Sequence, residues 1–342
     1  MKWFQTGLVL ALSLSVNSQI TPRGPTYGKP ALTIVRTITI LDADEVNAVS
    51  FSPNGKWIAG GIGDGTVRIW NVSDGKLVKR LKVQARTMQV AFSPDGSLIA
   101  TADMGPISLL RADDGQVLMR LPAADGKEDF LNGLAFSPDG KFIAAISGQA
   151  ATLWRVSDGK LIRTLARGEF SSASYSPGGY SVAFSSDGQM IFADGRRIKA
   201  WRLSDGRLTR FLGDDHEYSP LAVDPSGRVI AAGFGGIELL RLNNGDRLCS
   251  LQAKDMFGEF EALAFSPNGR LLVSSNLGDT HSPDQKIRLW DVNRCQLITT
   301  IQKFGGSYYR KLGFSSDGTL LAIPGKASSR TVGIRLFRVN SG

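Results

Sequence analysis

The sequence predicts an all-β protein: a seven-bladed β-propeller of four-stranded antiparallel blades, closed by an N-terminal strand that completes the last blade. A motif of the form Phe-Ser-Pro-Asp-Gly recurs seven times, beginning at Phe51, Phe92, Phe136, Phe184, Val223, Phe265 and Phe314. The copies lie about 44 residues apart, which is the length of one propeller blade. The apolar runs between them are too short for helices and read as strands sandwiched between layers.

The elements of the first blade illustrate the pattern. A first strand at Val46 to Phe51 runs into Ser-Pro-Asn-Gly, in which Pro presets the first turn angle and Gly takes a positive φ. A second strand begins at Trp57, and a third ends at Trp70 before the tight turn Ser73-Asp74-Gly75. A fourth strand, Leu77 to Leu81, completes the unit. Such a sheet buries both faces only by stacking on neighbours, which favours a closed ring.

The two ends of the repeat region predict how the ring closes. After Phe314 only 28 residues remain, enough for three strands but not for a fourth. Leu32 to Ile38 resembles the fourth strand at Lys160 to Leu165. We therefore predict that residues 31–342 form one propeller whose last blade takes its fourth strand from the N-terminal side.

The first thirty residues read as a targeting segment. Lys2 precedes an apolar stretch from Trp3 to Val16, and Val16-Asn17-Ser18 is a small-residue cleavage pattern. We predict a signal peptide over 1–18, a leader over 19–30, and export to the periplasm or the extracellular space. The alternative is an uncleaved anchor. The stretch is short for a transmembrane helix, and no other apolar run could span a bilayer, so the mature chain is expected to have no transmembrane span.

Composition excludes several classes of protein. The formal net charge of +9 favours anionic surroundings, but no nucleic-acid reader motif is present, so nucleic acid is not an expected partner. Catalytic signatures are absent, and the two histidines, His216 and His281, lie in separate loops. We expect no enzyme activity, no cofactor and no metal. The alternative is a propeller that binds a small ligand or catalyses a hydrolytic or lyase reaction through channel-mouth residues: Asp64, Asp194, Asp214, Asp279 and His281.

The repeats resemble the WD-repeat family of β-propellers. The closest segment is GDGTVRIWNVSDGKLVKRL at Gly63 to Leu81, and Trp290-Asp291 is the name-giving dipeptide. The resemblance implies a rigid, non-catalytic platform that binds peptides or proteins on the narrow face around its channel. The family's Gly-His pair is absent, and Asp42 stands near the first His position. The loop aspartates Asp64, Asp103, Asp194 and Asp279 therefore lack a His partner and are either free for a ligand or solvated in turns.

The inter-blade loops are acidic and interleaved with aromatic residues, which are common anchors at protein interfaces. We expect a monomer that binds a protein or peptide partner through this face. The candidate partner-binding residues are Asp42, Asp44, Glu45, Asp129, Asp214, Asp215, Glu217, Tyr218, Phe257, Glu259, Tyr308, Tyr309 and Arg310.

Basic residues are expected on the outer rim, where they either deter edge-to-edge strand pairing or make peripheral contact with an anionic envelope surface. They include Lys79, Arg163, Lys199, Arg210 and Arg288. Cys249 and Cys295 fall on neighbouring blades. Because outer strands of adjacent blades normally diverge, we expect no disulfide between them.

Overall fold

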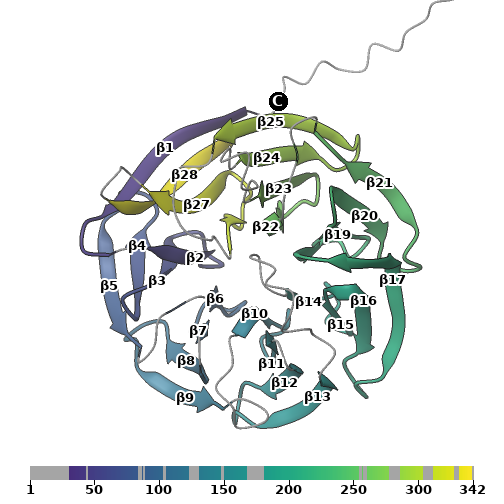
Figure 1. The fold of residues 1–342 in the computed structure, drawn as a ribbon. Coiled ribbons are helices and arrows are strands. Elements are labelled where there is room, and N and C mark those ends of the chain that lie inside the picture. The colour runs from purple at the N-terminus through teal and green to yellow at the C-terminus, as the bar shows by residue number, and fades with distance from the viewer. Residues whose placement is uncertain are drawn as a thin grey trace, which may run out of the picture.

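The computed structural model describes residues 31–43, 45–83, 87, 89–102, 105–122, 131–147, 150–167, 181–253, 256, 260–276, 286–302, 311–326 and 331–340. In these ranges the chain forms 28 strands in seven four-stranded antiparallel sheets, arranged radially around a central axis (Figure 1), and no helix. The predicted all-β, seven-bladed propeller is confirmed. The predicted signal peptide and leader lie outside the described residues. A search of the described residues finds no helix able to cross a membrane.

Each blade contributes one strand to each of four concentric layers. The innermost strands are β2 (Val46–Phe51), β6 (Gln89–Phe92), β10 (Leu131–Phe136), β14 (Val182–Phe184), β18 (Leu221–Val223), β22 (Phe260–Phe265) and β26 (Gly313–Phe314). The second strands are β3 (Trp57–Ile62), β7 (Leu98–Ala102), β11 (Phe142–Ser147), β15 (Met190–Ala193), β19 (Val229–Gly233), β23 (Leu271–Asn276) and β27 (Leu320–Lys326).

The third strands are β4 (Thr66–Asn71), β8 (Ile107–Arg111), β12 (Ala150–Arg155), β16 (Gly195–Arg202), β20 (Ile237–Arg241), β24 (Lys286–Asp291) and β28 (Val332–Asn340). The outermost strands are β5 (Leu77–Lys82), β9 (Val117–Leu121), β13 (Leu161–Arg167), β17 (Leu208–Tyr218), β21 (Arg247–Leu251), β25 (Gln296–Gln302) and β1 (Ala31–Ile40).

The recurring motif forms the turn between the first and second strands. In blade 1 the Ser52 hydroxyl accepts a hydrogen bond from the Trp57 amide at 2.9 Å and donates to Asn54 Oδ1 at 2.7 Å. Gly55 takes a φ of +69°. The same serine bonds recur in blades 2, 3, 4, 6 and 7, so the repeated residues are turn-forming residues.

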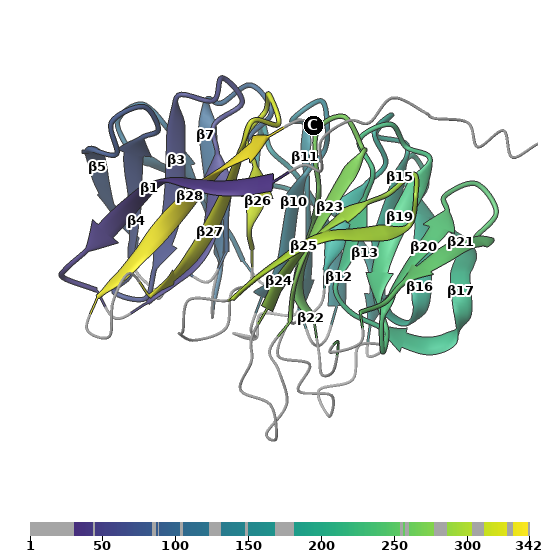
Figure 2. The ribbon, with the colours of Figure 1, turned by 90° about the horizontal axis from the view of Figure 1, so that it is seen from above.

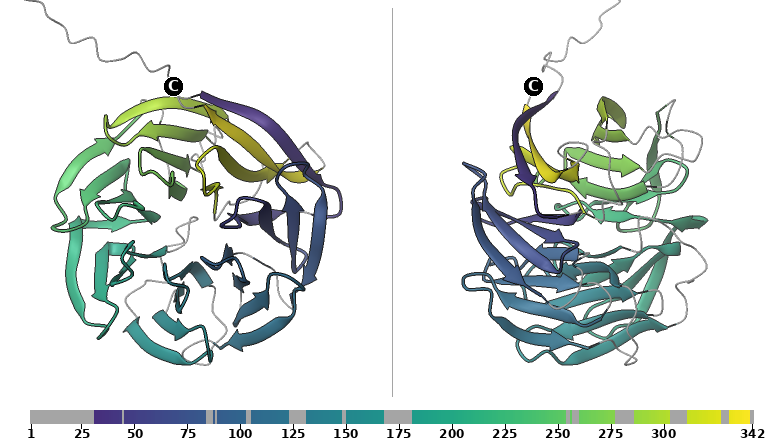
Figure 3. Two further views of the ribbon diagram at one scale, coloured as in Figure 1. Left: turned by 180° about the vertical axis from the view of Figure 1, so that it is seen from behind. Right: turned by 60° about the vertical axis from the view of Figure 1, so that its left-hand side comes forward.

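The ring closes as predicted. The last sheet has the order β1-β28-β27-β26, so the N-terminal strand is its outer strand. It pairs antiparallel with β28 from Ala31 opposite Asn340 to Ile40 opposite Val332. Figures 1 and 3 show these two ends of the described chain side by side in one blade.

The hydrophobic core lies between blades, in seven clusters that each join two neighbouring sheets. Four tryptophans at the ends of third strands, Trp70, Trp154, Trp201 and Trp290, are almost fully buried in these clusters. Burial of such large apolar side chains supplies most of the stability that face-to-face stacking provides.

A contact on the rim links neighbouring blades. One side chain of the outer strand reaches the turn between the third and fourth strands of the next blade. Arg36 donates to Asp74 O at 2.7 Å, Lys79 to Ala112 O at 3.3 Å, and Arg210 to Leu242 O at 2.8 Å. Some of the basic rim residues therefore bind blades to one another.

The predicted absence of a disulfide is wrong. Cys249 stands at the same register position as Lys79, and Cys295 lies in the corresponding turn of the next blade, with a φ of +52°. Their Cα atoms are 6.4 Å apart, and the two residues form a disulfide. The outer strands of adjacent blades do diverge, but Cys295 is not on an outer strand: it lies in the β24–β25 turn, beside β21, which carries Cys249.

Two of the residues assigned to the basic rim do not lie there. Lys199 on β16 and Arg288 on β24 belong to third strands and are only 4% and 1% exposed. The Arg288 guanidinium donates to Asn276 Oδ1 at 3.0 Å. These two cations lie in the interior rather than on the rim.

Candidate interaction surface

The propeller has two faces, which the edge view in Figure 2 separates. One carries the tight turns around Asn54 and Asp74. On the other, outer strands lead into the next inner strands, and second strands lead into third strands. We call the latter the loop face, and its described residues include Asp42, Asp64, His216 and Phe234.

The candidate partner-binding residues fall into three groups. Asp42 and Glu45 lie between β1 and β2, and Asp214, Asp215, Glu217 and Tyr218 lie on the last part of β17. The remaining seven lie outside the described residues: Asp44, Asp129, Phe257, Glu259, Tyr308, Tyr309 and Arg310. The described candidates thus form two sectors of the loop face, one at blade 1 and one at blades 4 and 5.

The blade 1 sector is a four-membered ion-pair network. Arg68, with its side chain 4% exposed, pairs with Asp42 and with Asp64, the latter at 2.6 Å. Arg80 pairs with Asp42 at 2.8 Å and with Asp64 at 2.9 Å. The hydrogen bond from Arg68 lowers the pKa of Asp42. The pKa of Asp64 is also lowered, since hydrogen bonds from Thr66 and Arg68 outweigh its desolvation.

This network corrects the expectation that Asp64 is either free for a ligand or merely solvated. Two arginines and Thr66 saturate its carboxylate, so it has a structural role in place of the family's His-based contact. The signal in the sequence was Arg68 itself. A lone cation in the strand Thr-Val-Arg-Ile-Trp, whose other residues are uncharged, needs an anionic partner when it is buried.

The blade 4–5 sector is the two-stranded ribbon at the ends of β16 and β17, and β17 bulges in it. Pairing steps from Ile198 opposite Leu212 to Arg196 opposite Glu217 and Gly195 opposite Tyr218, so residues 213–216 form the bulge. On this ribbon Asp215 pairs with Arg196 at 2.8 Å, and both side chains are well exposed. His216 stacks on Phe234, from the β19–β20 connection, with ring centroids 4.1 Å apart and planes inclined by 5°. Phe234 remains 42% exposed, so the stack presents an aromatic surface to solvent.

Tyr218 does not belong to that surface, although it was a candidate. It is fully buried, and its hydroxyl donates to Glu238 at 2.8 Å and accepts from the Asp214 amide at 3.0 Å. Burial, with the bond to Glu238, raises the pKa of Tyr218 to about 12. Arg247 also donates to Glu238 at 3.0 Å. Tyr218 therefore fixes the base of the ribbon, and Phe234, which sequence reasoning missed, is the exposed aromatic group.

The residues proposed for a catalytic or small-ligand site do not form one cluster in the part of the chain that the structure describes. Asp64 is ion-paired in blade 1, and Asp214 is exposed on β17. Asp194 is fully buried, and burial raises its pKa well above the usual range while the Ser181 amide donates to it at 2.8 Å. Asp103, Asp279 and His281 lie outside the described residues. Within the described part of the chain no group of three potential metal ligands occurs.

Comparison with known proteins gives two kinds of match. The family model for the WD domain, G-beta repeat, matches residues 35–71 and 258–291. The ribosome biogenesis protein BOP1 of Rattus norvegicus is 33% identical over 79 residues, and its homologue in Leishmania braziliensis is 45% identical over 53 residues. These matches cover 22% and 16% of this chain, but only 11% and 7% of the relatives. The chain thus spans about a tenth of the length of these relatives.

The comparison contradicts the predicted export. The relatives are named as ribosome biogenesis proteins, and ribosomes are assembled inside cells. The prediction depended on the first eighteen residues alone, where a short apolar stretch after one lysine is a weak pattern. The repeat matches and the seven four-stranded blades together show WD repeats in a seven-bladed β-propeller.

Proposed function

We propose that this propeller is a non-catalytic scaffold that binds a protein partner through the blade 4–5 sector of its loop face. The observation that supports this proposal is the exposed stack of His216 on Phe234, beside the Arg196–Asp215 ion pair. Aromatic residues, phenylalanine included, are enriched at protein interfaces, whose rims are polar. WD-repeat propellers are generally protein-binding platforms, which agrees with this assignment.

The ribbon suits this role because it is pre-organised. Strand pairing at Glu217 and Tyr218 and the buried Tyr218–Glu238 bond hold one end of the bulge, and the Tyr218 hydroxyl accepts from the Asp214 amide, so less conformational entropy is lost when a partner binds. Asp214, Asp215 and Glu217 are exposed along it on either side of His216, and Arg196 pairs with Asp215. A partner with a basic rim around an apolar group would complement this sector.

The test compares two phenylalanines of equal exposure. Phe234 is 42% exposed on the loop face, and Phe211 is 41% exposed on the outer strand, where Arg197 stacks on it. Cross-linked partners are captured from cells with wild type, Phe234→Ser and Phe211→Ser. We expect a partner that wild type and Phe211→Ser retain and that Phe234→Ser loses, with equal melting temperatures. A partner set that does not depend on Phe234 contradicts the proposal.

A second variant tests the charge. Changing Asp214, Asp215 and Glu217 together to Lys reverses the sign of the ribbon. It should slow association more than it speeds dissociation, since rim charges act mainly on encounter. The rates are measured by surface plasmon resonance with the captured partner. An association rate equal to that of wild type would show that the partner does not approach the ribbon.

A further inference from the structure

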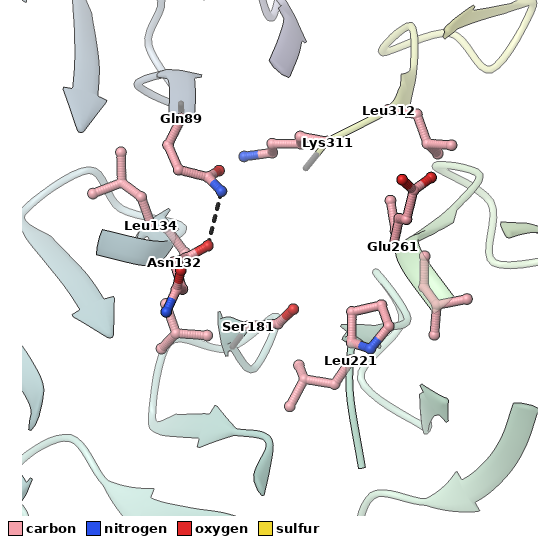
Figure 4. A pocket seen from close by; sticks show the side chains of 14 residues that line it. Gln89, Asn132, Leu134, Ser181, Leu221, Glu261, Lys311 and Leu312 are labelled. Atoms are coloured by element: carbon pink, nitrogen blue, oxygen red, sulfur yellow. Dashed lines mark hydrogen bonds between the residues drawn. The ribbon is translucent and has the colours of Figure 1, made fainter. Parts of the chain in front are cut away.

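A cavity of about 140 Å³ lies at the centre of the ring, between the inner strands (Figure 4). Its polar lining comes from Gln89, Asn132, Ser181, Glu261 and Lys311, and its apolar lining includes Leu134, Leu221 and Leu312. These residues belong to blades 2 to 7, so six of the seven blades contribute to its lining. No residue of the proposed partner-binding ribbon lines it.

The wall of the cavity is fixed by hydrogen bonds between blades. Gln89, which is 4% exposed, donates from Nε2 to Asn132 O at 2.8 Å, as the dashed line in Figure 4 shows. Lys311 O accepts from the Val49 amide at 3.3 Å, which ties its backbone to blade 1. These bonds hold the Gln89 side chain and the Lys311 backbone in position.

Lys311 points its ammonium group into the cavity (Figure 4). Among the described residues it forms no ion pair. The surrounding protein removes part of its hydration, and this desolvation lowers the pKa of Lys311 to about 8. Near neutral pH the side chain is therefore still mostly a cation. A partly desolvated cation that forms no ion pair is unfavourable, and an anion within contact distance would relieve that cost.

The lining also limits which anion fits. Glu261 is 1% exposed and lines the cavity as well, so a second negative charge on the ligand would be repelled. Liquid water occupies about 30 Å³ per molecule, which makes the cavity large enough for a carboxylate with a few carbon atoms. The leucines offer an apolar wall for those carbons. We propose that the central cavity binds a single carboxylate group, paired with Lys311 and carried on a short alkyl chain.

Two sources share this chemistry: a free short-chain acid, and a glutamate side chain presented on a peptide. Calorimetric titration at pH 7 with propionate, and separately with an acetyl-Gly-Glu-Gly-amide peptide, distinguishes them. Propionamide and the corresponding Gln peptide are the uncharged controls. Binding of propionate assigns the site to a free acid, and binding of the Glu peptide alone assigns it to a peptide side chain. Failure of both carboxylates to bind overturns the proposal.

Lys311→Met tests the pairing, because methionine keeps the length of the side chain and removes its charge. Carboxylate affinity should fall at least tenfold. Lys56→Met, at an exposed lysine on the face opposite the loop face, should leave the affinity unchanged. Removal of a desolvated amine should not lower the melting temperature, so loss of binding will not reflect unfolding. Equal affinity for propionate in wild type and Lys311→Met would overturn the proposal.

Amine labelling gives an independent readout. The rate at which acetic anhydride modifies Lys311, followed by peptide mass spectrometry against pH, reports the pKa of this amine. Saturating carboxylate should slow the labelling of Lys311 at pH 8 and leave Lys56 unaffected. Equal rates with and without carboxylate would contradict the pairing. Phe234→Ser should not change any of these results, which separates this proposal from the partner-binding one.

Discussion

The disulfide between Cys249 and Cys295 should account for a measurable part of the stability of the ring. It links β21 of blade 5 to the β24–β25 turn of blade 6, at a sequence separation of 46 residues. In the chain-entropy model, closing a loop of this length in the unfolded state stabilises the fold by about 4 kcal/mol at 25 °C. The unfolding entropy of a chain of 342 residues converts this into a fall in melting temperature of about 6 °C when the bond is absent.

The assay is scanning calorimetry of the wild type, oxidised and reduced, and of Cys249→Ser/Cys295→Ser. The chain offers a matched control in Lys79→Met, which alters the same register position in blade 1. There the contact is a partly exposed hydrogen bond at 3.3 Å and an ion pair at 3.5 Å, so its loss should cost below about 1 kcal/mol. Thiol titration of the folded wild type should find no reactive cysteine. Coincident melting of the oxidised and reduced proteins would refute the reasoning.

Three further predictions follow from buried groups and from ring closure. Burial raises the pKa of Asp194, so the folded state retains a proton that the unfolded state releases. The free energy of unfolding therefore falls as pH rises above about 4, by at most about 1.4 kcal/mol per pH unit. In urea unfolding, Asp194→Asn should therefore be more stable than wild type at pH 7 and equal to it near pH 4. A difference in unfolding free energy between the two proteins that does not vary with pH would contradict the raised pKa of Asp194. Tyr218→Phe removes a donor from the buried Glu238 carboxylate and should cost about 2 kcal/mol in the same assay; unchanged stability would show that the hydroxyl bond is dispensable. Deletion of residues 31–40 leaves β28 as an open edge and should destabilise the whole ring, so an unchanged melting temperature would disprove closure by the N-terminal strand.

The sequence was sufficient to predict the blades because the information they need is local. Ser52, Pro53, Asn54 and Gly55 form their turn within a few residues, and the same chemistry recurs at a regular interval. Closure could also be predicted, since the count of strands after Phe314 leaves one strand missing. The order of the residues and the length of each repeat suffice for both predictions.

The candidate site was harder to predict because its contacts join residues that are distant in the chain. Arg68 and Asp42 are separated by 26 positions, and Tyr218 and Glu238 by 20. An exposed-looking Asp-Asp-His-Glu-Tyr segment does not show that its tyrosine turns inward while its histidine stacks on Phe234. Such pairings depend on how adjacent blades pack, which no local pattern specifies.

The shared last blade also sets the order of events during synthesis. Asn340 donates to the Thr33 hydroxyl across a separation of 307 residues, at 3.2 Å. At a translation rate of about 5 to 20 residues per second, the first strand waits about 15 to 60 s for its partner. Throughout that interval Ile38 lacks the core residues of blade 7 that pack against it, among them Val332 and Ile334. The nascent chain is therefore an expected chaperone client, and at high concentration the same open edge invites residues 31–40 of a second copy, which makes domain-swapped dimers the expected misfolding product.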